Sequence, residues 1–147
     1  MSIAPYDWLE ASYFYYRPRD LRWKDGDGKV GHDLDKGFNI KASYQPSRHY
    51  LPRFAIGLDD LAGTGYFSRE YIVSTYDFNH LKLSIGAGWG KYDNGHGYSN
   101  PFGIFSDHFK DRNTASSKYG GTLSIDEWFS GNASIFGGIE WFVPYGR

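Results

Sequence analysis

Strict alternation of apolar residues with polar residues or glycine is the feature that most constrains what this chain can fold into. In 38–44 the apolar members are Phe38, Ile40, Ala42 and Tyr44, and in 81–89 they are Leu81, Leu83, Ile85, Ala87 and Trp89. Because successive side chains of a strand point to opposite faces, this period of two predicts strands with one apolar face and one polar or open face.

Looser alternation predicts four more strands, at 9–16, 54–59, 70–75 and 134–143. In 70–75, Tyr71, Val73 and Thr75 share one face, and Ile72 interrupts the pattern on the other. Aromatic residues make up 20% of the chain and glycine contributes 19 residues, which favours a β protein over a helical bundle. The sequence therefore predicts an all-β fold of about six strands.

The predicted connections differ in length in a regular way. Long segments at 18–36 and 92–132 and a medium loop at 60–69 alternate with short turns at 45–50 and 77–80. This rhythm predicts one antiparallel up-and-down meander over 1–147, with long loops at one end. Outer-membrane barrels show the same asymmetry, with short turns on one side and long loops on the other. A soluble β-sandwich can show it too, so the rhythm leaves both architectures open.

The two architectures differ in where the bulky side chains point. In a transmembrane barrel, they face lipid and the polar set lines a lumen; in a soluble sheet, they form a buried core. Six strands are fewer than the roughly eight of the smallest single-chain barrels. The barrel reading therefore needs further strands, from a longer chain or from other subunits. Its lipid-facing residues would be Phe38, Ile40, Ala42, Leu81, Leu83, Ile85, Ile135 and Ile139, and its lumen-facing residues would be Asn39, Lys41, Ser43, Lys82, Ser84, Gly86, Gly88 and Glu140.

Composition excludes several classes of function. The chain has no cysteine, so disulfides, thiolate metal sites and cysteine nucleophiles are absent. A formal net charge of -1 argues against a nucleic-acid partner. The sequence contains no run of about 18 apolar residues, so it predicts no transmembrane helix. Residues 1–7 have neither a cationic start nor an apolar stretch, so we expect either a cytoplasmic chain or one whose secretion signal lies outside this sequence.

Local motifs indicate no catalytic or cofactor site. The glycine-rich 86–90 is followed by a loop signal rather than a helix, which argues against a nucleotide loop. The Asp-Gly repeat at 25–28 has Lys36 where a calcium loop needs glutamate, and the five histidines lack metal-ligand spacing. We therefore expect no metal, no cofactor and no enzymatic activity.

Two carbohydrate-directed alternatives stay open. A carboxylate pair for glycoside hydrolysis could come from Asp59, Asp60, Asp126, Glu127 and Glu140, but the sequence fixes no separation between them. A soluble sandwich or small barrel could instead bind sugars by stacking on the loop aromatics Trp23, Tyr66, Tyr98 and Trp128. The same loop aromatics could also pack the long loops into a plug or cap.

Several strings resemble the YjbH family of exopolysaccharide- or capsule-related lipoproteins. The more specific ones are LDKGF at 34–38 and GTGYFSREY at 63–71, and the full set lies at 8–12, 34–41, 50–52, 55–71, 86–90, 100–102 and 136–141. The resemblance implies an outer-membrane β-barrel of a Gram-negative bacterium that helps to export a polysaccharide. Family members are longer and carry a secretion signal, so the chain would correspond to an N-terminal barrel portion. The resemblance implies outer-membrane lipid, polysaccharide and the remaining barrel strands as partners, and no catalytic residues.

Overall fold

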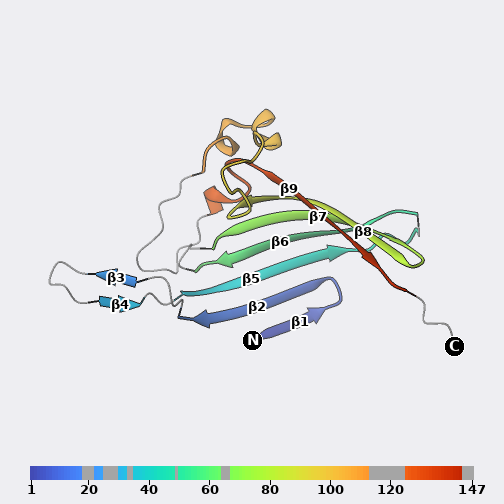
Figure 1. The fold of residues 1–147 in the computed structure, drawn as a ribbon, viewed down its shortest axis with the longest axis horizontal. Helices are drawn as coiled ribbons and strands as arrows, with labels where there is room; N and C mark the ends of the chain where they lie inside the picture. Colours follow the sequence, from blue (N-terminus) through green and yellow to red (C-terminus); the bar gives the residue numbers. More distant parts are fainter. Residues whose placement is uncertain are drawn as a thin grey trace.

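A computed structural model describes residues 1–17, 22–24, 30–32, 35–48, 50–63, 67–112 and 125–143, with 22–24 and 30–32 described as backbone only. Seven antiparallel strands form one open sheet in the order β1-β2-β5-β6-β7-β8-β9 (Figure 1). The predicted all-β, up-and-down meander is therefore confirmed. The strands are β1 (Ser2–Tyr6), β2 (Leu9–Tyr16), β5 (Asp35–Tyr44), β6 (Arg53–Leu61), β7 (Arg69–Phe78), β8 (Leu81–Gly90) and β9 (Ser134–Trp141).

The prediction of about six strands is too low. It missed β1, which pairs with β2 through Ser2↔Ser12 and Ile3↔Ala11. Pro5 lies in this strand and argues against it locally, but an edge strand tolerates proline because one side of its backbone is unpaired. The predicted 18–36 loop also contains a two-stranded hairpin, β3 (Arg22–Lys24) with β4 (Val30–His32).

The connections alternate between the two ends of the sheet. Residues 7–8, 45–52 and 79–80 connect strands at one end of the sheet, which we call the turn end. The connections 62–68 and 91–133 lie at the opposite, loop end, and 91–133 is the longest connection of the sheet. The 91–133 connection contains the 3-10 turns η1 (Pro101–Ile104), η2 (Asp107–Phe109) and η3 (Ile125–Glu127). In the described part of the chain, no helix has the length and apolar character needed to cross a membrane.

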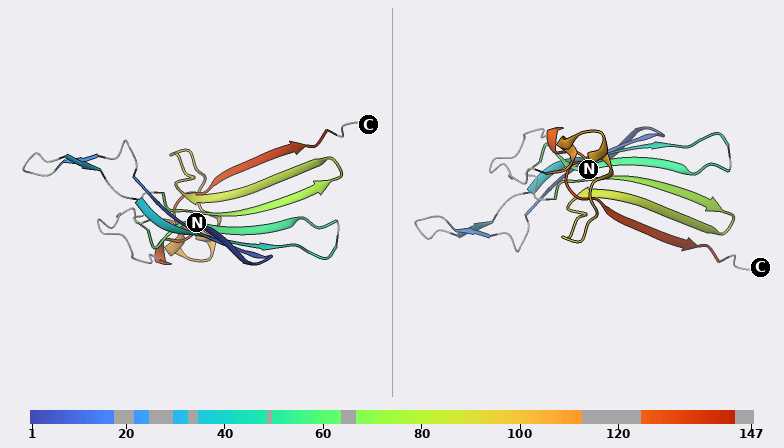
Figure 2. Two further views of the ribbon diagram at one scale, coloured as in Figure 1. Left: turned by 90° about the horizontal axis from the view of Figure 1, so that it is seen from below. Right: turned by 90° about the horizontal axis from the view of Figure 1, so that it is seen from above.

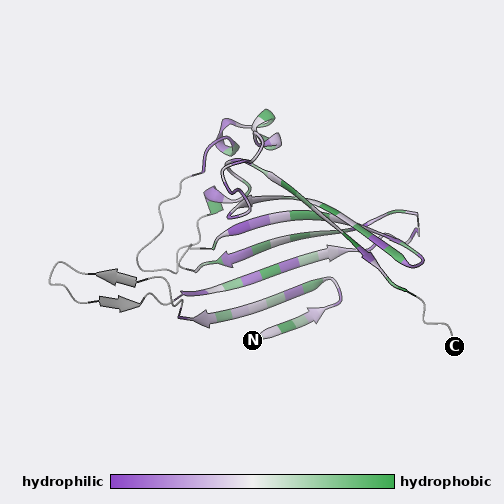
Figure 3. Ribbon diagram, in the orientation of Figure 1, coloured by the Kyte–Doolittle hydropathy of each residue, from purple (hydrophilic) through white to green (hydrophobic). Residues whose placement is uncertain are grey.

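Cross-strand pairing sorts the side chains onto two faces. The pairs Ala42↔Ile56, Ile56↔Ile72, Ile72↔Ala87 and Ala87↔Ile135 run across five strands. Directly paired residues project from the same side of a sheet, so these residues define one apolar face. Colouring by hydropathy shows the alternation along β5 (Figure 3).

The interpretation of Ile72 as an interruption is wrong. Ile72 lies on the apolar face, and Tyr71, Val73 and Thr75 lie on the opposite, polar face. The strand also continues to Phe78, so the turn is reduced to Asn79–His80. The pairing of β7 with β6 and β8 determines which of its residues lie on each face. The composition of 70–75 did not reveal this assignment.

A bulge keeps the two faces in phase at the loop end of β5 and β6. The register shifts between Phe38↔Leu61 and Ile40↔Leu58, and Asp60 has φ 60°. Its backbone N–H donates to Asn39 Oδ1 at 3.1 Å. One extra residue in the strand returns Leu61 to the apolar side, which a regular ladder would not allow.

Away from Trp89, the apolar face is not covered by a second layer in the described structure. Phe38 is 48% exposed, Ile85 60% and Ile139 70%. The buried apolar residues among those described are Trp89 and Ala133. The sheet is therefore a wall with two accessible surfaces rather than one half of a closed core.

Candidate functional site

The polar face carries cross-strand ion pairs. Lys41 Nζ lies 2.6 Å from Glu10 Oε2, and Arg69 Nε lies 2.7 Å from Asp59 Oδ2. Two further pairs, Arg53–Asp77 at 3.1 Å and Lys82–Glu140 at 3.8 Å, lie toward the turn end. Each pair joins one cation to one carboxylate, so the charges along this face cancel locally.

The register places the eight polar-set residues of the sequence interpretation on this one face. They are distributed over β5 (Asn39, Lys41, Ser43), β8 (Lys82, Ser84, Gly86, Gly88) and β9 (Glu140). The Ser84 and Thr75 hydroxyls lie 2.9 Å apart across β7 and β8. The face therefore offers hydroxyl, amide and paired charged groups rather than bulk apolar surface.

An aromatic cluster on the same face was missed by sequence reasoning. The Tyr92 and Phe136 rings stack with centroids 5.2 Å apart, and Tyr71 meets Phe136 edge-on at 6.5 Å. We call Tyr71, Tyr92 and Phe136 the aromatic platform. Its rings take the space that side chains would need at the glycines beneath them; a Cβ on Gly86, for example, would lie 2.5 Å from Phe136 Cζ.

The available signal for the platform was the run of glycines on β8, which suits either a close approach of packed surfaces or an open lumen wall. The structure fills part of that opening with rings from neighbouring segments. Tyr71 covers Gly57, Tyr92 covers Gly88, and Arg69 lies over the Tyr92 ring at 5.2 Å. All three platform residues are half-buried, so each keeps part of its ring accessible.

A polar hollow of about 220 Å³ adjoins the platform. Tyr71 and Asp59 lie on its border, and the rest of its lining comes from β1, β2 and β5, with Glu10, Ser12, Asn39 and Lys41 supplying the polar groups. Asn39 Nδ2 donates to Ser12 Oγ at 3.2 Å, which orients the amide within the hollow. The platform and the hollow therefore form one continuous polar and aromatic surface.

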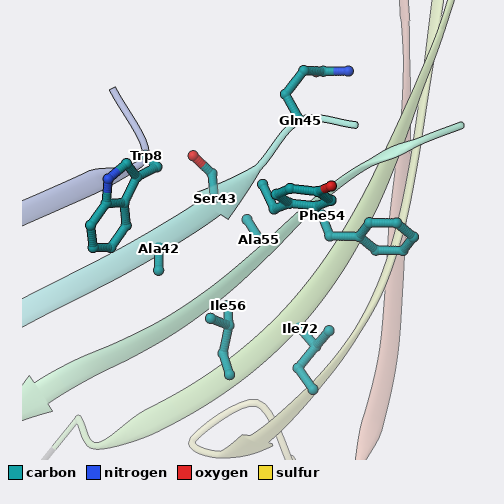
Figure 4. Close-up of a pocket in the computed structure, with 9 residues that line it drawn as sticks. Trp8, Ala42, Ser43, Gln45, Phe54, Ala55, Ile56 and Ile72 are labelled. Carbon is teal, nitrogen blue, oxygen red and sulfur yellow. The ribbon is translucent and has the colours of Figure 1, made fainter. Parts of the chain in front are cut away.

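The apolar face carries the other predicted set. Pairing places Phe38, Ile40, Ala42, Leu81, Leu83, Ile85, Ile135 and Ile139 on it. Toward the turn end it has a hollow of about 600 Å³, with Trp8, Ala42, Phe54, Ile56 and Ile72 among its lining residues (Figure 4). Such a surface has few hydrogen-bonding groups and suits contact with hydrocarbon.

A folded segment covers the loop end of the apolar face. We call residues 99–112 and 125–133 the cap; its 3-10 turns gather at one end of the sheet (Figure 2). Trp89 stacks on Phe102 with centroids 5.3 Å apart and meets Phe129 edge-on at 5.2 Å. Because Trp89 shares a face with Leu83, Ile85 and Ala87, the cap packs on the apolar side.

A buried ion pair fastens the cap to β7. The Arg112 guanidinium donates from Nη1 to Glu70 Oε2 at 2.6 Å and from Nη2 to Glu70 Oε1 at 2.9 Å. The same carboxylate accepts the Phe129 backbone N–H at 3.1 Å, and Arg112 also reaches Ser68 Oγ at 2.8 Å. Two-point pairing of this kind fixes geometry as well as charge.

Asn100 organises the interior of the cap. Its Nδ2 donates to the carbonyls of Phe109 and Phe129, each at 2.7 Å, and its Oδ1 accepts the Phe102 N–H at 3.0 Å. One buried amide thereby joins three separate parts of the segment.

One titrating group stands out at the loop end of β2. Burial, followed by a hydrogen bond to Asp35 and the negative charges of Asp35 and Asp60, raises the pKa of Tyr16 to about 12. Tyr16 pairs with Asp35 at the loop end of β2 and β5. The preceding pair, Tyr15 with Lys36, is the last on the apolar face. A neutral phenol therefore donates to a carboxylate at the border of the sheet.

The candidate carboxylates for glycoside hydrolysis and the candidate sugar-stacking loop aromatics do not gather at one place. Asp59 pairs with Arg69, Asp126 and Glu127 lie in η3 of the cap, and Glu140 lies toward the turn end of β9. Tyr98 is exposed beside its bridge to Ala133, and Trp128 is half-buried after η3. The Trp23 side chain and Tyr66 lie outside the described residues.

Comparisons with known proteins agree on one family. The family model YjbH, described as exopolysaccharide biosynthesis protein YbjH, matches residues 1–147. The lipoprotein YjbH of Escherichia coli (strain K12) is 30% identical over 146 residues, which cover 98% of this chain and 21% of that protein. The chain thus spans about a fifth of the length of this curated relative. No solved structure matches the chain significantly.

Proposed function

The chain belongs to the YjbH family, and from this premise we propose that it forms part of the wall of an outer-membrane β-barrel in a Gram-negative bacterium. The barrel serves exopolysaccharide export. The apolar face contacts lipid, the polar face lines a water-filled lumen, and the chain performs no catalysis. The family's name supports the link to exopolysaccharide. The separation of apolar and polar side chains onto two faces supports the lipid and lumen assignments.

The observation that carries the proposal is the exposed apolar face. In water, a patch of this extent would be an unusual surface for a monomeric protein. In lipid it is the expected surface. β5, β7 and β8 have 10 residues each, which matches the roughly 9–11 residues of a tilted transmembrane strand.

Aromatic side chains border this face at both ends. Tyr44 and Trp141 lie toward the turn end, and Tyr13 and Tyr15 lie toward the loop end. Rings with an apolar body and a polar edge are enriched at membrane–water interfaces. Their placement supports a hydrocarbon layer between the two groups.

The edges of the sheet supply the argument for partner strands. In the described sheet, β1 and β9 are the two outer strands and each pairs along one side only. An unpaired strand edge is not tolerated in lipid because its backbone groups find no water. The barrel is therefore completed by strands from a longer chain or from other subunits.

The test is arginine substitution at adjacent residues that point to opposite faces. Ile85→Arg should weaken folding into lipid vesicles by about 2–4 kcal/mol because its charge enters hydrocarbon. Ser84→Arg, the matched control, places the same charge on the polar face and should cost far less. Folding into vesicles together with the strands that complete the barrel, followed by urea titration, measures both. Equal insertion of Ile85→Arg and the parent chain would refute the lipid assignment.

A further inference from the structure

We propose that the aromatic platform and the adjoining polar hollow form a binding subsite for one uncharged pyranose residue of a polysaccharide. The inference rests on the proposed function, which makes a polysaccharide the molecule that passes this face. Its aromatic residues are Tyr71 of β7, Phe136 of β9 and Tyr92, which follows β8, and none of them is among the loop aromatics Trp23, Tyr66, Tyr98 and Trp128.

The platform supplies a stacking surface that is fixed in place. Phe136 and Tyr92 are parallel within 14°, and the backbone beneath them comes close because glycines lack side chains. Arg69 covers part of Tyr92 from one side. A pyranose has a face of C–H groups that packs against an aromatic ring, and a ring held in advance loses little conformational freedom on binding.

The hollow supplies hydrogen-bonding groups beside Tyr71, the platform residue that lines it and that meets Phe136 edge-on. Lys41 uses one contact for Glu10, and an ammonium has three N–H donors. The Glu10 and Asp59 carboxylates each have more acceptor positions than their ion pairs use. A sugar hydroxyl both donates and accepts, so it suits a site that offers both kinds of group.

Size and charge define the ligand class. A volume of about 220 Å³ is below the roughly 300–1,000 Å³ of pockets for drug-sized ligands, so the hollow suits a single sugar residue. The cations at the site, Lys41 and Arg69, are each paired with a carboxylate. An anionic sugar would meet these carboxylates, which favours an uncharged one.

The experiment uses the full chain in detergent micelles and saturation-transfer NMR with maltotetraose as the neutral probe. We expect saturation of its ring protons, and weaker transfer to an oligogalacturonate of equal length. Phe136→Leu should reduce transfer about five-fold, within the range that aromatic contacts contribute. Phe136→Tyr keeps the ring and should retain binding. Tyr76→Leu, on the apolar face, is the matched control.

A second variant decides the outcome if Phe136→Leu fails to fold. Lys41→Gln leaves the platform intact and should reduce transfer to the same probe. No transfer in the parent chain, or full transfer in both Phe136→Leu and Lys41→Gln, would overturn the subsite. The comparison of Ile85→Arg with Ser84→Arg, made together with the strands that complete the barrel, separates the two proposals. Equal insertion of Ile85→Arg and the parent, with sugar binding retained, refutes the barrel wall alone. Weakened insertion of Ile85→Arg, with no sugar binding by the parent, refutes the subsite alone.

Discussion

Replacing Glu70 with glutamine should release the cap while the sheet stays folded. Glu70 is buried and accepts three hydrogen bonds, two from Arg112 and one from the Phe129 backbone. Glutamine preserves the shape but removes the charge and turns one acceptor into a donor that faces the guanidinium. Removing one partner of a buried ion pair costs about 3–5 kcal/mol because the other charge remains buried.

Amide hydrogen exchange measures this effect locally. The Phe129 N–H bonds to Glu70, and the Gly131 N–H bonds to the Phe109 carbonyl at 3.0 Å, so both report on the cap. At about 1.4 kcal/mol per factor of ten, their exchange should accelerate roughly 100- to 1,000-fold or more, up to the rate of global opening. The Ile72 amide serves as the control in the sheet and should change little.

A double substitution tests the physical reason. Glu70→Leu with Arg112→Leu removes both charges, so it should cost less than the sum of the single substitutions. Unchanged exchange at Phe129 and Gly131 in Glu70→Gln would refute the reasoning. Additive costs in the double substitution would show that the two charges do not stabilise each other.

Three further substitutions test other parts of the structure. Gly86→Ala would place a Cβ 2.7 Å from a backbone carbonyl oxygen and should lower the free energy of unfolding in urea by about 1–3 kcal/mol. In the control Gly138→Ala the new Cβ meets nothing within 4 Å, so this substitution should be nearly neutral. Equal losses in the two variants would contradict the prediction. Asn100→Asp replaces a donor to two carbonyls with an acceptor and should lower the midpoint of thermal unfolding, while Asn94→Asp at an exposed site should not. The pKa of Tyr16 is raised from 10.0 to about 12, so its stabilising contribution is complete below pH 10 and is lost as the pH rises through 12. The difference in 295 nm absorbance between the parent and Tyr16→Phe should therefore develop mainly above about pH 11. A difference that is already complete by that pH would refute the raised pKa.

Period-two alternation was sufficient to predict the main strands. In 38–44 and 81–89, every second residue is apolar, and no helical pattern competes, so the strands and their two faces follow from local chemistry. The same reasoning failed at Ile72. Tyr71 is large enough to resemble a member of the apolar face, but its ring packs over Gly57 on the polar side. The neighbouring strand decides this, and it lies outside any local window.

The cap and the platform depend on contacts that a local pattern does not encode. Glu70 and Arg112 are separated by 42 residues, and nothing near either one indicates its partner. The bulge at Asp60 was likewise invisible, because aspartate is common in turns and tolerates a positive φ with little signature. The strands could be predicted from the local sequence, whereas the candidate site depends on the register between strands.

The attachment of the cap has a consequence for the passage of molecules along the opposite face. Because Trp89 and Glu70 hold the cap against the apolar side of the sheet, the cap lies away from the face that carries the paired charges. Under the barrel proposal, the cap would sit outside the rim, next to lipid headgroups or a neighbouring protein. The opening would then stay free of the cap, and control of passage would have to come from other segments.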